Sequence, residues 1–97
     1  MKRSLKSVVV AFGLVGLAAS AQAAEKVSFI LNWVAGGDHA PYYYAKKLGW
    51  YEQAGIDIDL IQGKGSAVAA QRAGAGVDQF GLADLSTVMV AVGKGAD

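Results

Sequence analysis

Strand-like and helix-like segments alternate along this chain beyond residue 24, and this alternation restricts the fold more than any other feature of the sequence. Three segments have the apolar patterns of strands and three have those of helices: the strands are 27–32, 56–61 and 79–82, and the helices are 41–48, 67–73 and 85–93. Strands that alternate with helices pair in parallel and are joined by right-handed crossovers. The order βαβαβα therefore predicts an α/β fold built on a parallel sheet.

The two longer strands differ in the spacing of their apolar residues. Segment 27–32 is too apolar for a strand that is wet on one face, so we expect it in the centre of the sheet. Segment 56–61 begins Ile-Asp-Ile-Asp, which indicates one buried and one solvated face near a sheet edge rather than a catalytic carboxylate pair at Asp57 and Asp59. The last helix has apolar residues at amphipathic spacing and is expected to end at glycine: Leu85, Val88, Met89 and Val92, then Gly93 or Gly95.

The first 23 residues have the three parts of a secretory signal peptide. Basic residues open the chain, an uncharged apolar run covers 8–19, and small residues stand at Ala21 and Ala23, the positions that a signal peptidase reads. The apolar run is shorter than the roughly 20 residues that cross a bilayer, which argues against a membrane anchor. We expect cleavage after Ala23, export to the periplasm, and a mature domain of residues 24–97.

Removing this segment changes the charge balance of the chain. Six basic and eight acidic residues remain, a net charge of −2, and no cluster of Lys or Arg is left to bind nucleic acid or an anionic membrane. The absence of Cys excludes disulfides and a lipid-modified cysteine, and a single His is too few for a structural zinc site. We expect a soluble monomer that binds a small-molecule solute and carries no metal and no cofactor.

Six of the nine aromatic residues lie between positions 33 and 51, around a polar Gly-rich loop. Flat rings beside a few polar groups are typical of small-molecule sites. In a parallel sheet such a site lies beyond the carboxyl ends of the strands, so the candidate loops are 33–40, 62–66 and 83–86. We predict no catalytic residue; the candidate ligand-binding residues are Asn32, Trp33, Asp38, His39, Tyr42, Gly65, Ser66, Asp84 and Ser86.

Each candidate in the first loop has a structural alternative. Asn32 and Trp33 would equally suit a strand-end turn and a core ring. Asp38 is expected to cap the helix after it and His39 to be partly exposed, so both are kept only as hydrogen-bonding partners of a ligand. Consecutive helical residues point about 100° apart, so only one of the three tyrosines at 42–44 can face a ligand while the others pack.

The other two loops allow two interpretations each. Gly65 and Ser66 stand before a helix, where free backbone N–H groups attract an anion or a polar headgroup, but Ser66 would also serve as a plain N-cap. The spacing is not that of a phosphate-binding Walker loop, since Lys64 precedes both residues. Asp84 and Ser86 have the same two interpretations at the start of the last helix.

From residue 27 to the end, the chain resembles the opening of the periplasmic substrate-binding proteins of ABC importers, in the group that binds thiamine-precursor pyrimidines and alkanesulfonates. The resemblance is carried by Leu31-Asn32-Trp33, Asp38-His39-Ala40-Pro41, Lys47-Leu48-Gly49-Trp50-Tyr51, Ala54-Gly55-Ile56, Gly65-Ser66 and Phe80-Gly81-Leu82-Ala83-Asp84. It implies a type II two-lobed fold that closes on a small ligand and docks on an inner-membrane permease. Residues 24–97 would form the N-terminal part of lobe 1, so we expect a truncated chain.

The resemblance implies that Trp33 stacks on a thiamine-precursor pyrimidine or a similar small heteroaromatic. The alternative ligand is an alkanesulfonate, taurine or nitrate-type anion held by Ser66 and helix N-termini. The fungal pyrimidine synthases share this architecture but carry a Lys and a His after strand three, where residues 83–87 have neither. We therefore expect a protein that is not an enzyme; an exported module without a ligand is a further alternative.

Overall fold

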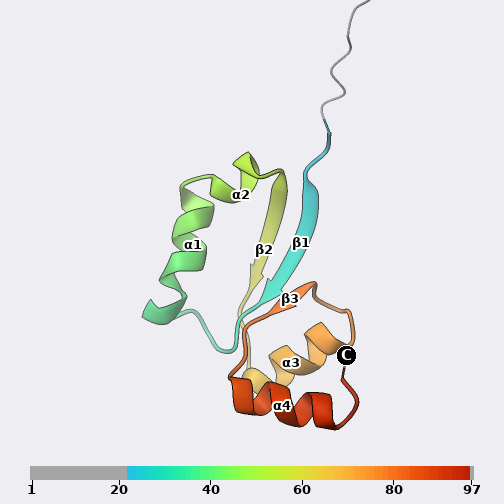
Figure 1. The fold of residues 1–97 in the computed structure, drawn as a ribbon. Helices are drawn as coiled ribbons and strands as arrows, with labels where there is room; N and C mark the ends of the chain where they lie inside the picture. The colour runs from blue at the N-terminus through green and yellow to red at the C-terminus, as the bar shows by residue number, and fades with distance from the viewer. Residues whose placement is uncertain (1–21, 97) are drawn as a thin grey trace, which may run out of the picture.

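The structure is a computed structural model and describes residues 22–96 (Figure 1). The predicted signal peptide lies outside the described residues except for its last two positions, so it stays a prediction. The elements are β1 (Glu25–Ile30), the 3-10 turn η1 (Gly37–His39), α1 (Ala40–Lys47), α2 (Trp50–Gln53), β2 (Ile56–Ile61), α3 (Ser66–Gly74), β3 (Phe80–Gly81) and α4 (Leu85–Gly93). Within the described part, no helix is long and apolar enough to cross a membrane.

The three strands form one parallel sheet in the order β2-β1-β3, which confirms the predicted α/β class. The apolar strand β1 is central and the alternating strand β2 is at an edge, both as expected. The register of β1 against β2 runs from Glu25 beside Ile56 to Ile30 beside Ile61. It places the carboxyl ends of both strands, and the loops that follow them, at the same edge of the sheet.

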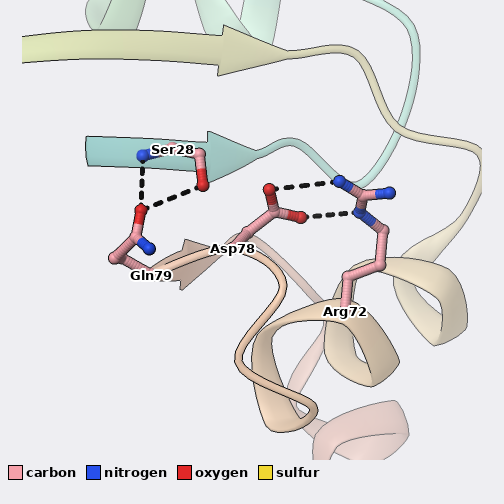
Figure 2. Close-up of polar contacts among 4 residues, drawn as sticks. All are labelled: Ser28, Arg72, Asp78 and Gln79. Carbon is pink, nitrogen blue, oxygen red and sulfur yellow. Dashed lines mark hydrogen bonds and ion pairs between the residues drawn. The ribbon is translucent and has the colours of Figure 1, made fainter. Parts of the chain in front are cut away.

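Two strands have other bounds than predicted: β1 runs over residues 25–30 instead of 27–32, and β3 over 80–81 instead of 79–82. Strand β1 ends two residues early because the carbonyl of Asn32 accepts a hydrogen bond from Gly65 N–H (2.8 Å), in the loop after β2. Strand β3 is shorter than 79–82 because the side chain of Gln79 replaces a backbone partner of β1. Its Oε1 accepts from Ser28 N–H (2.8 Å) and from the Ser28 hydroxyl (3.0 Å), as Figure 2 shows.

Helices cover the sheet in two groups. Helices α1 and α2 lie along β2, while α3 contacts β1 and β3 and α4 packs on α3 (Figure 1). On the α1 side the ring of Tyr42 lies 5.2 Å from the ring of Phe29 and lines an apolar cavity of about 250 Å³. The most buried apolar side chains of the described residues come from the strands and α3: Ile30, Leu31, Ile58 and Ala69.

Of the predicted apolar stripe of α4, Val88 alone is half-buried. Leu85, Met89 and Val92 are exposed, while Val88 and Ala91 turn toward α3 and are half-buried. Six of the nine residues of this helix are apolar, so the i, i+3, i+4 spacing exists on more than one face and does not identify the buried one.

A buried ion pair joins the end of α3 to the segment before β3. Asp78 is 2% exposed, and Arg72 binds it with two nitrogens: Nε donates to Oδ2 at 2.6 Å and Nη2 to Oδ1 at 3.2 Å (Figure 2). This bidentate contact lowers the pKa of the Asp78 carboxyl below its ordinary value; burial opposes the shift and the Ser28 hydroxyl adds to it. The sequence analysis did not consider either residue.

Candidate functional site

The three loops predicted to carry the site lie side by side at the carboxyl edge of the sheet. The loop after β1 accepts two backbone hydrogen bonds from the loop after β2: Gly63 N–H to Trp33 O (3.0 Å) and Gly65 N–H to Asn32 O (2.8 Å). The third loop joins through Asp84 N–H, which donates to the Ser66 hydroxyl oxygen at 3.1 Å. The structure thus brings together six of the nine candidates: Asn32, Trp33, Gly65, Ser66, Asp84 and Ser86.

His39 also belongs to this group, although it was expected to be partly exposed. Its side chain is 1% exposed, and its Nε2 lies 2.7 Å from the Oδ1 of Asn32. The turn η1 folds the imidazole under the loop, where Nδ1 accepts from Gly36 N–H at 3.0 Å. The expectation of a partly exposed His39 is wrong, because the turn η1 precedes α1 and turns the ring inward.

Asp38 does not cap α1. The N-cap position is His39, which makes no side-chain cap, and Pro41 stands in the first turn of the helix as predicted. The exposed Asp38 carboxylate instead faces the imidazole, with its Oδ1 3.5 Å from His39 Nδ1. Asp38 therefore lies at the rim of the site as a negative charge beside a buried ring.

The two aromatic candidates have different surroundings. Trp33 is 58% exposed beside Asn32, so its ring is available to stack on a ligand. Tyr42 does not join the other candidates, because it packs on Phe29 in the apolar cavity on the α1 side of the sheet. Of the other rings of this stretch, Tyr43 and Tyr51 are half-buried, while Tyr44 and Trp50 are exposed.

The starts of α3 and α4 are capped differently. Gly65 is the N-cap of α3 and offers no side chain, so the interpretation of Ser66 as the N-cap is wrong; Ser66 is the first helical residue. Gly65 has φ +117°, a conformation that L side chains rarely adopt, which accounts for glycine here. The first-turn N–H groups of α3 therefore have no side-chain cap, which leaves them free to meet a polar ligand group.

Asp84 fills the corresponding place on α4. Its Oδ1 accepts from Thr87 N–H (2.9 Å) and from the Ser86 hydroxyl (2.6 Å), and the Thr87 hydroxyl donates to both carboxylate oxygens. These bonds, with the Ser86 hydroxyl as the largest contribution, lower the pKa of Asp84 far below its ordinary range. The start of α4 thus holds a carboxylate of its own and is a poor place for an anionic ligand.

Sequence reasoning missed two residues that shape these loops. The side-chain oxygen of Gln62 accepts a hydrogen bond from Ala35 N–H (3.2 Å) and so holds the loop after β1 in place. Gly63 lies so close to the backbone just after β1 that a Cβ on it would be 1.7 Å from the carbonyl oxygen of Leu31. The available signal was a Gln-Gly pair directly after an apolar strand, at the carboxyl edge where the site was already expected.

The chain matches one known protein family. The model of the family described as NMT1/THI5 like matches residues 37–97, more than half of the chain. The chain belongs to the NMT1/THI5-like family. This confirms the resemblance found in the sequence, since the family is that of the thiamine-precursor, sulfonate and nitrate binding proteins. No solved structure gives a significant match.

The curated relatives are fungal enzymes. A 4-amino-5-hydroxymethyl-2-methylpyrimidine phosphate synthase of Candida albicans is 27% identical over 71 residues, which are 73% of this chain and 21% of that protein. Synthases of the same name from Saccharomyces cerevisiae (THI11) and Schizosaccharomyces pombe are 25% and 27% identical, with 73% of this chain and 21% and 20% of those proteins covered. The chain thus spans about a fifth of the length of these relatives.

These names overturn one expectation. Residues 83–87 hold neither Lys nor His, which predicts a protein that is not an enzyme, but the matching relatives are named as synthases. The expectation of a non-enzyme is therefore wrong, because two differences in one loop do not separate this chain from enzymes that share the rest of the segment.

Proposed function

We propose that this chain supplies one wall of a binding site for a thiamine-precursor pyrimidine, captured in the periplasm for an ABC importer. The observation that carries the proposal is the exposed ring of Trp33 beside Asn32 at the carboxyl edge of the sheet. An aromatic face and an adjacent amide suit an aminopyrimidine, which stacks through its ring and hydrogen-bonds through its edge.

Two further observations support a heteroaromatic ligand over a simple anion. The carboxylate of Asp84 occupies the start of α4, and Asp38 adds a second negative charge at the rim, so anions meet repulsion from both. The uncapped start of α3 is the one place among these three loops that suits an anion. A sulfonate or nitrate ligand therefore has weaker support than a pyrimidine.

A second candidate function is synthesis of the pyrimidine rather than its transport. It is favoured by the names of the relatives, which make 4-amino-5-hydroxymethyl-2-methylpyrimidine phosphate. Both candidate functions require a site that accepts this heterocycle. They differ in whether the pyrimidine is released unchanged or formed by the protein.

A thermal-shift panel tests the proposed ligand. We expect 4-amino-5-hydroxymethyl-2-methylpyrimidine to raise the Tm of the protein as its gene encodes it, by linkage to the folded state, and its phosphate to raise the Tm less because Asp84 and Asp38 repel the added charge. Taurine and nitrate at equal concentrations represent the alternative ligands, the sulfonates and nitrate-type anions. Stabilisation by taurine without any by the pyrimidines would contradict the proposal.

A further inference from the structure

The buried imidazole of His39 has both of its nitrogens in use. Nδ1 lies 3.0 Å from the backbone nitrogen of Gly36, and Nε2 lies 2.7 Å from Oδ1 of Asn32. A backbone N–H can only donate, so Nδ1 accepts and carries no proton. The proton of the neutral ring is then on Nε2, which donates to Asn32.

This tautomer fixes the orientation of the Asn32 carboxamide. Its Oδ1 is held by the buried ring, so Nδ2 lies on the other branch of the amide. Among residues 22–96, every buried side-chain nitrogen or oxygen of a residue that is not exposed has a hydrogen-bond partner. Nδ2 of Asn32 has no partner among these residues, so it is not buried. The Nδ2 group is therefore accessible to solvent, on the residue that precedes the exposed Trp33.

We propose that His39 is a positioning residue that fixes Asn32 with its Nδ2–H groups on the ligand side, so that the site selects a heterocycle presenting a hydrogen-bond acceptor there. An unprotonated ring nitrogen of a pyrimidine is such an acceptor. The selectivity rests on the proposed function, while the positioning of Asn32 does not. An amide held in one orientation discriminates between ligands, because a hydrogen-bond donor on the ligand would face the Nδ2–H donor of Asn32.

The neighbouring charges do not disturb this arrangement. Asp38 is the acidic group that faces the ring, 3.5 Å from Nδ1, and Lys64 is an exposed cation of the loop after β2. A hydrogen on Nδ1 would face the N–H of Gly36, whereas a hydrogen on Nε2 points at an oxygen of Asn32. Only the opposite neutral tautomer would turn the amide around.

The first experiment needs no ligand. In two-bond ¹H–¹⁵N spectra of the protein at neutral pH, we expect Nδ1 of His39 to be unprotonated and Nε2 to carry the proton. The Asn32 side-chain NH₂ signals should change in His39→Asn, which can still accept from Gly36 but cannot reach Asn32. They should stay near their wild-type positions in His39→Gln, whose amide can donate to Asn32. The opposite tautomer, or equal changes in both variants, would overturn the positioning role.

The second experiment tests selectivity with the probe 4-amino-5-hydroxymethyl-2-methylpyrimidine. Asn32→Asp keeps an oxygen for His39 but replaces the outward donor by an acceptor, so we expect Kd to rise about tenfold or more. His39→Asn should weaken binding more than His39→Gln. Binding by the wild type that is unchanged in Asn32→Asp would overturn the selectivity. Absence of any pyrimidine binding by the wild type would refute the proposed function and the selectivity with it, while the spectra still decide the positioning role.

Discussion

Gly63→Ala is expected to prevent the chain from folding. A Cβ at this position would lie 1.7 Å from the carbonyl oxygen of Leu31 and 2.8 Å from the carbonyl carbon of Asn32, and both atoms belong to the backbone. Backbone cannot move aside as a flexible side chain can, so the loop after β2 would have to move away from the loop after β1. The hydrogen bonds from Gly63 to Trp33 and from Gly65 to Asn32 would be lost with it. We expect a cost of about 3 kcal/mol or more, enough to unfold a small domain.

Gly93→Ala is the matched control. Gly93 is the last residue of α4, and a Cβ built on it meets no atom within 4 Å. Alanine in a helix is more favourable than glycine by up to about 1 kcal/mol, so this variant should be as stable as the wild type or slightly more stable. Circular dichroism melts of the three proteins provide the comparison. A Gly63→Ala protein that melts at the wild-type temperature would show that the close approach to Leu31 is wrong.

Arg72→Ala should be far more damaging than Asp78→Ala, although both remove the same ion pair. Arg72 is 39% exposed, so without its partner it can be solvated by water. Asp78 is 2% exposed, so without Arg72 a carboxylate is left buried and unpaired. Removing one partner of a buried pair in this way costs about 3–5 kcal/mol in other proteins. Equal urea midpoints for the two variants would contradict the burial of Asp78.

The same pair gives a pH dependence with a defined sign. Arg72 lowers the pKa of Asp78, so the pair stabilises the folded state above the ordinary carboxyl pKa of about 3.9, and this stabilisation is lost as the pH falls through the lowered value. Without Arg72, the burial that remains raises the pKa of Asp78 instead. The stability deficit of Arg72→Ala should therefore be largest at pH 7 and shrink toward pH 3, as measured by urea titration at both pH values. Arg72→Lys, which keeps the charge but loses the bidentate geometry, should lie between the wild type and Arg72→Ala.

The sheet could be predicted from the sequence because its strands differ in their apolar pattern. The continuous apolar run of β1 indicated a central strand and the Ile-Asp alternation of β2 an edge, and the structure shows both. The same reasoning failed for α4, where apolar residues on all sides left the buried face undetermined. Periodicity identifies a buried face only where polar residues mark the opposite one.

The site could be predicted as a set of loops but not as a set of contacts. Parallel strand order was enough to bring the loops containing Asn32, Ser66 and Asp84 together. The burial of His39 could not be read from its neighbours, because it depends on a 3-10 turn that turns the ring under the loop. The closeness of Gly63 to β1 likewise depends on how two loops meet in space, which no local pattern encodes.

The most direct test of the proposed function is ligand-induced quenching of Trp33 fluorescence. The protein as its gene encodes it is titrated with 4-amino-5-hydroxymethyl-2-methylpyrimidine and, separately, with taurine, beside a Trp33→Phe variant that keeps an aromatic face. We predict saturable quenching of the wild type by the pyrimidine and none by taurine, with the quenching lost in Trp33→Phe although calorimetry still detects binding. Saturable pyrimidine binding that leaves Trp33 fluorescence unchanged, or quenching by taurine alone, would contradict a pyrimidine site at Trp33.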